Sequence, residues 1–316
     1  MSLPLTWTLS QIQALLAGDL ESWGNTSPAT PSTLAQFESA GALDLAVLPR
    51  RASPLQIRAC RAGVVVGDHR QAQDWRTGQK LTGASGWFLR VEDSGWALWQ
   101  ILDGPCRIPD NPDWLSIDEI VDRFGAQART AMVHRNAMVG KNTWIGPGAV
   151  LHAGVRVGEC CRVGEGTVLG APGFGMLEKA GRLWPLPHWA GVTVESDVWL
   201  GPQCQVSAGL LEPTFVGQGV RLDAQVQVGH NAHIGAGSVM AGQSGLAGSV
   251  VLGEGCLVGG QAGIAEHVVL GDGCQVAAKS GVTRSWPCGT RLAGFPAIAL
   301  GVWKRTIRTD RMSRNA

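Results

Sequence analysis

Every sixth residue between Val216 and Val282 is apolar, and this spacing constrains the fold more than any other feature of the sequence. The twelve positions are Val216, Leu222, Val228, Ile234, Met240, Leu246, Leu252, Val258, Ile264, Leu270, Val276 and Val282. A helix repeats its apolar residues about every 3.6 positions and a half-buried strand every two, so a strict period of six fits neither. The period predicts a coiled parallel β-structure in which each six-residue unit is a short strand and a corner, and three units complete one coil.

In such a solenoid the coils stack about 4.8 Å apart through backbone hydrogen bonds. The branched apolar residue of each unit fills the interior, and a small residue four positions later fits where the corner crowds it. Ala232, Ser238, Cys256 and Cys274 occupy this second position. The repeat is long enough for a self-supporting core, because at least three repeats are needed.

The same step also runs through an earlier segment, with two interruptions. The earlier apolar positions are Val133, Val139, Ile145, Leu151, Val157, Val163 and Leu169, followed after a gap by Val194, Leu200 and Val206. The gap, residues 171–191, is predicted to be a loop expelled from the solenoid, and loops of this length are usually functional or disordered. A four-residue excess through Glu212 and Pro213 is the second interruption.

The first hundred residues do not repeat and predict a small α/β domain. We expect helices over 9–16, from Leu34 through Phe37 to Gly41, from Pro54 onward, and around 96–102. We expect strands at 43–47, 64–66 and 87–91. The predicted organisation is an N-terminal domain over 1–103, a linker over 104–130 with a short helix over 116–124, the β-helix over 131–287 and a tail over 288–316 that is helical.

Composition and charge exclude several classes of function. The formal net charge is +1, so no bulk electrostatic attraction favours nucleic acid or an anionic membrane surface. No apolar stretch approaches eighteen residues and no signal-like segment opens the chain, so we expect a cytoplasmic protein without an integral membrane segment. The eight cysteines form no C-x-x-C pair. Those that fall at the small-residue position are expected to be buried small hydrophobes: Cys161, Cys204, Cys256 and Cys274.

Two histidines share one side of the predicted solenoid. His230 follows Val228 and His267 follows Ile264, and these apolar positions are two complete coils apart. The two histidines should therefore lie about 10 Å apart along the axis. A neutral histidine can accept a proton from an attacking amine or hydroxyl, and Asp223 is available to orient or polarise nearby groups.

Other interpretations of the histidines stay open. A single surface histidine on a solenoid can be inert, and we assign no role to His134, His152 or His233. A zinc site built from three histidines is disfavoured, because His230 and His233 lie near opposite ends of one unit. We therefore expect no metal.

Several motifs together give the chain a resemblance to the UDP-3-O-(3-hydroxyacyl)glucosamine N-acyltransferase (LpxD) family of lipid A biosynthesis. The most specific stretch runs from Leu222-Asp223 to His230-Asn231, with Gly242-Gln243, Gly248-Ser249, Gly260-Gln261 and His267 after it. The other motifs are Val133 to Ala137, Gly173-Phe174-Gly175, Pro187-His188, Gly294, Pro296 and Trp303. The resemblance implies a left-handed parallel β-helix that works as a homotrimer.

The resemblance also implies a reaction and roles for individual residues. The reaction is transfer of a 3-hydroxyacyl chain from the phosphopantetheine thioester of acyl carrier protein to the 2-amino group of UDP-3-O-acylglucosamine, with no other cofactor. His230 is then expected to be the general base, His267 the second active-site histidine and the Gly248 N–H the oxyanion donor. The residues expected to contact the nucleotide sugar are Asn231, Phe174 and His188.

Two departures from the family pattern concern the acceptor. The chain reads Val206-Ser207-Ala208-Gly209 where the family has a charged pair, and Val47-Leu48-Pro49-Arg50-Arg51 where the family has aromatic residues that stack uracil. Arg50 or Arg51 is expected to stack on the base or pair with phosphate instead. The alternatives are a paralogue that acylates a different nucleotide-linked amino sugar, and a non-catalytic trimeric scaffold.

The tail from Ala299 carries a basic side. Its arginines recur every three residues and are Arg305, Arg308, Arg311 and Arg314, with Lys304 beside them. On a helix they gather on one side, which can dock the acidic acyl carrier protein. The alternative is a solvated terminal helix.

Overall fold

The computed structural model describes residues 3–23, 30–49, 52–80, 86–104 and 113–306. The chain divides into two compact units. Met1–Asp110 and Gly175–Ala190 form the first, and Asn111–Phe174 and Gly191–Ala316 form the second.

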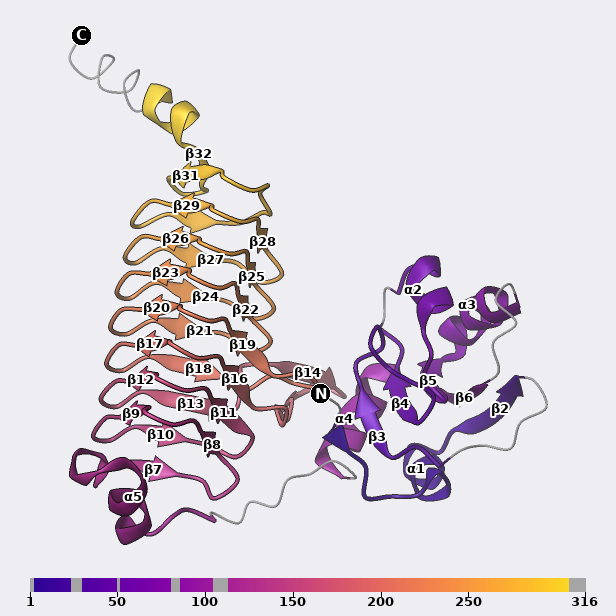
Figure 1. The fold of residues 1–316 in the computed structure, drawn as a ribbon. Helices are drawn as coiled ribbons and strands as arrows, with labels where there is room; N and C mark the ends of the chain where they lie inside the picture. The colour runs from indigo at the N-terminus through magenta and orange to yellow at the C-terminus, as the bar shows by residue number, and fades with distance from the viewer. Residues whose placement is uncertain (1–2, 24–29, 50–51, 81–85, 105–112, 307–316) are drawn as a thin grey trace. The chain divides into compact units, whose positions relative to one another are not determined.

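The first unit is built on a six-stranded sheet in the order β1-β3-β4-β5-β6-β2 (Figure 1). The strands are β1 (Leu3–Pro4), β2 (Asp19–Trp23), β3 (Thr33–Ala35), β4 (Asp44–Val47), β5 (Val64–Asp68) and β6 (Gly86–Val91). The four central strands are parallel, and β1 and β2 pair antiparallel at the two edges. The predicted strands at 43–47, 64–66 and 87–91 are confirmed as β4, β5 and β6.

Four helices accompany this sheet. They are α1 (Leu9–Leu16), α2 (Pro54–Ala59), α3 (His69–Lys80) and α4 (Ser94–Asp103). The predicted helix start at Ser53-Pro54 is confirmed, because the Ser53 hydroxyl accepts the Gln56 N–H and Pro54 is the first helical residue. Ile57 of α2 and Trp75 of α3 lie in one core cluster with Phe88 of β6, whereas α4 packs against β4 and β5 and contacts α1.

The predicted helix from Leu34 through Phe37 is wrong. Leu34 and Ala35 lie in β3, where they pair in parallel with Leu45 and Ala46 of β4. Both residues are buried by this pairing, so tertiary packing overrides the local helical spacing. Helix α3 was not predicted, because its largely polar sequence has no apolar period.

The predicted loop 171–191 contains a β-hairpin whose body belongs to the first unit rather than to the β-helix. Strands β14 (Met176–Lys179) and β15 (Arg182–Pro185) pair antiparallel. Trp184 contacts the stacked indoles of Trp96 and Trp99 on α4, with ring centroids 5.5 and 5.0 Å away. The Trp99 Nε1–H donates to the Pro185 carbonyl at 3.0 Å. These contacts explain why residues 175–190 cluster with the N-terminal domain.

The second unit opens with helix α5 (Ile117–Phe124) and η1 (Ala126–Ala128) and continues as a parallel β-helix (Figure 1). The Ser116 hydroxyl and the Glu119 carboxylate cap the start of α5 reciprocally, and Glu119 also pairs with Arg135 at 2.7 Å. The predicted helix over 116–124 is confirmed.

The β-helix has three sheets, which we call A, B and C. Sheet A contains β7 (Met132–Val133), β10 (Val150–Leu151), β13 (Val168–Ala171), β18 (Gln205–Ser207), β21 (Gln227–Val228), β24 (Gly245–Leu246), β27 (Gly263–Ile264) and β30 (Gly281–Val282). Sheet B contains β8 (Met138–Val139), β11 (Val155–Val157), β16 (Val192–Val194), β19 (Thr214–Val216), β22 (His233–Ile234), β25 (Val251–Leu252) and β28 (Val269–Leu270). Sheet C contains β9 (Trp144–Ile145), β12 (Arg162–Val163), β17 (Trp199–Leu200), β20 (Arg221–Leu222), β23 (Val239–Met240), β26 (Leu257–Val258), β29 (Gln275–Val276), β31 (Arg291–Ala293) and β32 (Ile298–Ala299).

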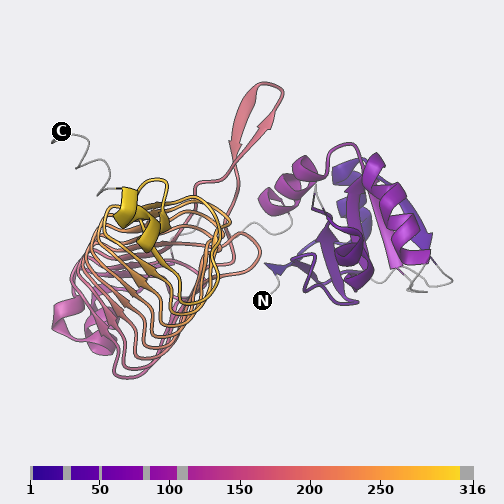
Figure 2. The same ribbon diagram turned by 90° about the horizontal axis from the view of Figure 1, so that it is seen from above.

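The predicted fold class is confirmed. Val228, Leu246 and Ile264 pair in parallel register one coil apart, and the apolar position of every six-residue unit from Val216 to Val282 is buried. Figure 2 shows successive coils lying over one another along the stack. Cys161, Cys204, Cys256 and Cys274 are buried as predicted.

The corners of the coils use left-handed backbone conformations and carry a ladder of side chains. Four glutamines with φ between 56° and 60° stack at the corner that leads from sheet C into sheet A. In the last three, the amide Nε2 donates to the Oε1 of the glutamine in the preceding coil, at 2.7 to 2.9 Å. The members of this glutamine ladder are Gln203, Gln225, Gln243 and Gln261.

After β30 the chain adds β31 and β32 to sheet C, and residues 300–306 then form a helix, drawn in yellow in Figure 1. Within the tail predicted to be helical over 288–316, the described residues are helical only at 300–306, because β31 and β32 extend sheet C first. The indole of Trp303 packs over Gly294, where an added methyl group would lie 2.6 Å from its Cδ1.

Candidate active site

His230 and His267 lie on the same edge of the β-helix, where sheet A turns into sheet B. The His230 carbonyl accepts the Ser249 N–H at 2.8 Å, and the Gly248 carbonyl accepts the His267 N–H at 3.2 Å. Gly248 therefore lies in the coil between the two histidines, which are two coils apart, about 10 Å along the axis. The predicted common side of the solenoid is present. His230 is half-buried, whereas His267 is exposed.

The imidazole of His230 is packed between two glycines. A methyl group added at Gly248 would lie 2.5 Å from Nε2 and 2.7 Å from Cε1 of His230. A methyl group added at Gly173 would lie 2.6 Å from Cβ and 2.9 Å from Cδ2 of the same residue. Such distances are far below ordinary van der Waals contact, so both positions require glycine if the ring is to keep this place.

The backbone N–H of Gly248 fits the predicted oxyanion donor. Among the residues that the structure describes, none accepts a hydrogen bond from it. Gly248 is half-buried and its Cα lies against the Nε2 edge of His230. A preorganised N–H beside a base is the arrangement that stabilises charge developing on a tetrahedral intermediate.

The Asn231 side chain is held by backbone groups of the same chain. Its Oδ1 accepts the Leu210 N–H at 3.0 Å, and its Nδ2 donates to the Glu212 carbonyl at 3.0 Å. Its backbone N–H donates to the Thr214 hydroxyl at 2.9 Å. The side chain is therefore engaged by the 208–213 connection between β18 and β19, and its Oδ1 also lies 3.2 Å from Nδ1 of His230.

Within this chain, Asp223 is not placed to orient His230. It follows β20, at the corner where sheet C turns into sheet A, whereas His230 follows β21 at the next corner. Its carboxylate accepts the Ala224 N–H at 2.7 Å and the Gly242 N–H at 2.9 Å. Asp223 thus links two successive coils of this chain.

The two predicted residues of the inserted segment lie in different units. Phe174 belongs to the second unit, directly follows Gly173 and is 86% exposed. His188 belongs to the first unit and is only 3% exposed, so its ring is not accessible to a substrate in this structure.

The predicted basic residues are only partly visible. Arg50, Arg51, Arg308 and Arg311 lie outside the described residues. Arg305 lies in the terminal helix, 300–306, and is exposed.

An apolar groove passes Ala247, which directly precedes Gly248 in the chain. Its volume is about 640 Å³, and it runs over the outer face of sheet A beside Ala247 and Ala265. The outward positions of β24, β27 and β30 are all glycines, so the floor of the groove has no side chains there: Gly245, Gly263 and Gly281. The exposed ring of Phe295 lies over Gly281 at the far end.

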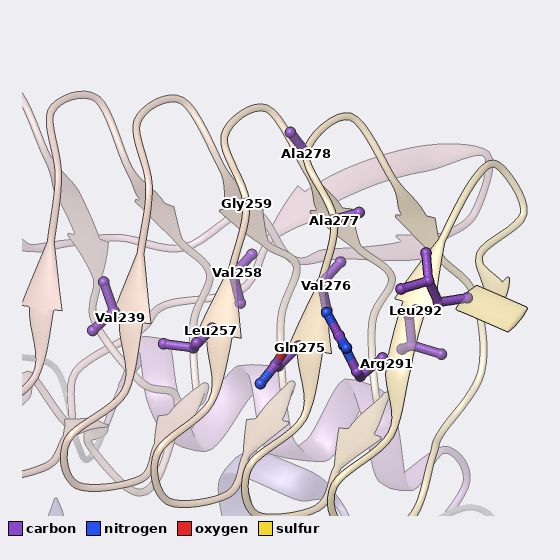
Figure 3. Close-up of a pocket in the computed structure, with 11 residues that line it drawn as sticks. Val239, Leu257, Val258, Gly259, Gln275, Val276, Ala277, Ala278, Arg291 and Leu292 are labelled. Atoms are coloured by element: carbon purple, nitrogen blue, oxygen red, sulfur yellow. The ribbon is translucent and has the colours of Figure 1, made fainter. Parts of the chain in front are cut away.

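A second cavity, of about 330 Å³, lies on a different face. Figure 3 shows Val239, Leu257, Gln275 and Arg291 along its floor on adjacent strands of sheet C. This cavity lies on sheet C, away from the corner between sheets A and B that carries the histidines, so we do not assign the chemistry to it.

Two further findings bear on the possible chemistry. In the described part of the chain, no group of three or more His, Cys, Asp or Glu residues is placed to hold a metal ion. Nor does any helix within those residues have the length and apolarity to cross a membrane.

Comparison with known proteins agrees with the repeat. The bacterial transferase hexapeptide (six repeats) model matches residues 136–171 and 249–284. A UDP-3-O-acylglucosamine N-acyltransferase 2 of Legionella pneumophila subsp. pneumophila is 49% identical over 143 residues, which cover 45% of this chain and 42% of that protein. A UDP-3-O-acylglucosamine N-acyltransferase of Herminiimonas arsenicoxydans is 43% identical over 86 residues, 27% of this chain and 25% of that protein.

The chain thus matches between a quarter and about two fifths of the length of these curated relatives. Among solved structures, a UDP-N-acetylglucosamine acyltransferase from Campylobacter jejuni aligns with a TM-score of 0.46 and 20% identity, over 58% of this chain and 81% of that chain. The chain therefore carries the bacterial transferase hexapeptide repeat and is similar, over part of its length, to UDP-3-O-acylglucosamine N-acyltransferases.

Proposed function

We propose that this chain is an N-acyltransferase that moves a 3-hydroxyacyl chain from acyl carrier protein to the 2-amino group of UDP-3-O-acylglucosamine. The observation that supports it is the placement of His230 Nε2 against the backbone of Gly248, whose chain neighbour Ala247 lines an apolar groove. The names of the curated relatives, UDP-3-O-acylglucosamine N-acyltransferases, supply the acceptor.

The geometry supports a direct attack of the amine on the thioester. The amine nitrogen forms a bond to the carbonyl carbon while neutral His230 takes its proton at Nε2. The Gly248 N–H donates to the oxyanion of the tetrahedral intermediate, which is worth about 3 kcal/mol for one such donor. The C–S bond then breaks, and the imidazolium of His230 returns the proton to the leaving thiolate.

The groove on sheet A suits the acyl chain. Its glycine floor is smooth and its lining is largely apolar, so a hydrocarbon chain entering beside Ala247 gains burial over several coils. Phe295 at the far end is placed to limit how far the chain extends. Lys279, which also lines the groove, carries a positive charge near that end.

The remaining parts of the proposal concern partners. The exposed His267 lies one coil beyond Gly248 and is placed to contact the acceptor or the carrier. Lys304 and Arg305 of the terminal helix fit docking of an acidic carrier protein. We propose a homotrimer as the working assembly, which light scattering of the purified protein tests.

The test uses purified protein with 3-hydroxyacyl carrier protein and UDP-3-O-acylglucosamine. We expect turnover by wild type and a loss of about 10²–10⁴-fold in His230→Ala, the range for a lost general base. His233→Ala is the matched control, because His233 lies on the outer face of sheet B, stacked on Phe215 with ring centroids 4.6 Å apart. Turnover that survives in His230→Ala contradicts the assignment of the base.

The acceptor needs its own comparison. Activity with another nucleotide-linked amino sugar, and none with UDP-3-O-acylglucosamine, identifies the chain as a paralogue. Failure with every amino-sugar acceptor, for protein that is folded and assembled, favours the scaffold over the enzyme.

A further inference from the structure

The orientation of the Asn231 side chain is fixed by backbone groups. A backbone N–H can only donate and a carbonyl oxygen can only accept. The Leu210 N–H donates to Oδ1, and Nδ2 donates to the Glu212 carbonyl, each at 3.0 Å. A flipped amide would bring N–H against N–H and oxygen against oxygen, so the assignment of the two amide atoms follows from the network itself.

This orientation determines which nitrogen of His230 carries the proton. Oδ1 of Asn231 lies 3.2 Å from His230 Nδ1, and an amide oxygen can only accept a hydrogen bond. Nδ1 must therefore be the donor. Because a neutral imidazole carries one N–H, its Nε2 keeps the lone pair. Nε2 is the nitrogen that faces Gly248 and, under the proposed function, accepts the proton of the amine.

We propose that Asn231 is a positioning residue that holds His230 in the Nδ1–H tautomer, and that the 208–213 connection serves to hold Asn231. The repeat itself needs only six residues per unit, so the four extra residues have no role in the coil. In the structure they bring the Leu210 N–H and the Glu212 carbonyl to the Asn231 amide. The proposal rests on the proposed function only for the role of His230 as a base.

Two substitutions of Asn231 separate orientation from folding. Asn231 has φ 57°, a left-handed conformation that glycine and aspartate both tolerate. Asn231→Gly removes the acceptor that faces Nδ1. Asn231→Asp keeps an acceptor for both Nδ1 and the Leu210 N–H but loses the donor to Glu212. Asn142→Gly is the matched control. Asn142 lies at an exposed corner with φ 58°, so this substitution replaces a left-handed asparagine by glycine away from the site.

The primary readout is the tautomer of His230, measured by ¹⁵N NMR of histidine-labelled protein with the signal assigned by its loss in His230→Gln. We expect Nδ1 protonated and Nε2 unprotonated in wild type and in Asn142→Gly, and a substantial Nε2–H population in Asn231→Gly. With carrier and acceptor, kcat should fall about 10–100-fold in Asn231→Gly, as for other residues that orient a functional histidine. Asn231→Asp should retain most of the wild-type kcat.

The outcomes distinguish the two proposals. An Nε2–H tautomer in wild type, or a tautomer that is the same in Asn231→Gly as in wild type, overturns the role of Asn231. A kcat for Asn231→Gly equal to that of wild type also overturns the role of Asn231. If wild type turns over no amino sugar, the proposed function fails, while the NMR comparison still decides whether Asn231 sets the tautomer.

Discussion

Gly248→Ala tests the contact between the central coil and His230. The three atoms closest to the added methyl group all belong to the imidazole ring, at 2.5, 2.7 and 3.1 Å. The φ of Gly248 lies outside the left-handed range, so alanine adds no backbone strain. The cost is therefore overpacking against the ring, about 1–3 kcal/mol of stability. The ring can relieve the contact only by moving, which displaces Nε2 from the proposed reacting position.

A double-mutant cycle isolates this cost from any other effect of the methyl group. In His230→Ala the three contacting ring atoms are absent, so adding Gly248→Ala should cost nothing. It should even stabilise slightly, because replacing a glycine at a compatible position restricts the unfolded chain. We expect a coupling energy of about 2 kcal/mol between the two substitutions, measured by urea unfolding of the single and double variants.

Gly173→Ala provides the contrast. Its nearest neighbour is the Cβ of His230, at 2.6 Å, and alanine keeps that atom. The destabilisation by Gly173→Ala should therefore persist in His230→Ala, whereas that by Gly248→Ala should disappear. Equal costs of Gly248→Ala with and without the ring would refute the packing argument, and with it the claim that Gly248 faces Nε2.

Three further predictions concern the scaffold. Gln243→Asn tolerates the left-handed corner but is too short to reach its two neighbours in the glutamine ladder, so we expect a loss of about 1 kcal/mol in urea unfolding. The Arg135 guanidinium and the cap of α5 lower the pKa of Glu119 from 4.5 to about 2. A carboxylate whose pKa is lowered by folding stabilises the native state above its unfolded pKa and loses that contribution as the pH falls. Glu119→Gln keeps the cap but removes the charge. Wild type should therefore be slightly more stable than Glu119→Gln above pH 4.5, and this difference should vanish towards pH 2. Thermal unfolding of both proteins over this pH range measures it. Burial raises the pKa of the Cys204 thiol to about 11, whereas Cys160 is exposed, so a thiol reagent at neutral pH should label Cys160 in the native protein and Cys204 only after unfolding. Equal labelling rates in the native state, read by peptide mass spectrometry, would contradict the described burial.

The β-helix was predictable because a strict period of six residues is compatible with only one type of fold. Branched residues at every sixth position must share one interior, and only a coil of short strands places them there. The helix predicted through Leu34 failed for the opposite reason. Its spacing was local, while the burial of Leu34 in β3 depends on pairing with Leu45, which lies outside any local window.

The site was predictable only in part. The repeat alone places His230 and His267 on one edge, because their apolar neighbours are whole coils apart. The same period already separates Asp223 from His230, since Asp223 follows Leu222, one unit before Val228, and therefore lies at another corner. The Gly173-Phe174-Gly175 motif marked this segment, but the contact of Gly173 with His230 could not be predicted from the repeat, because it joins segments more than fifty residues apart.

The two interruptions of the repeat both converge on His230, and there is a physical reason for this. In an uninterrupted solenoid, every coil presents the same corner, so no corner differs from its neighbours except by its side chains. A base needs a fixed ring, a fixed tautomer and one face that is kept dry, and these depend on groups that the coil does not supply. The segment after β13 brings Gly173 against the ring, and the 208–213 connection fixes the Asn231 amide beside Nδ1. The repeat itself supplies Gly248 on the Nε2 side of the ring. The irregular segments therefore contact His230 on its other sides, and the regular coils position Gly248.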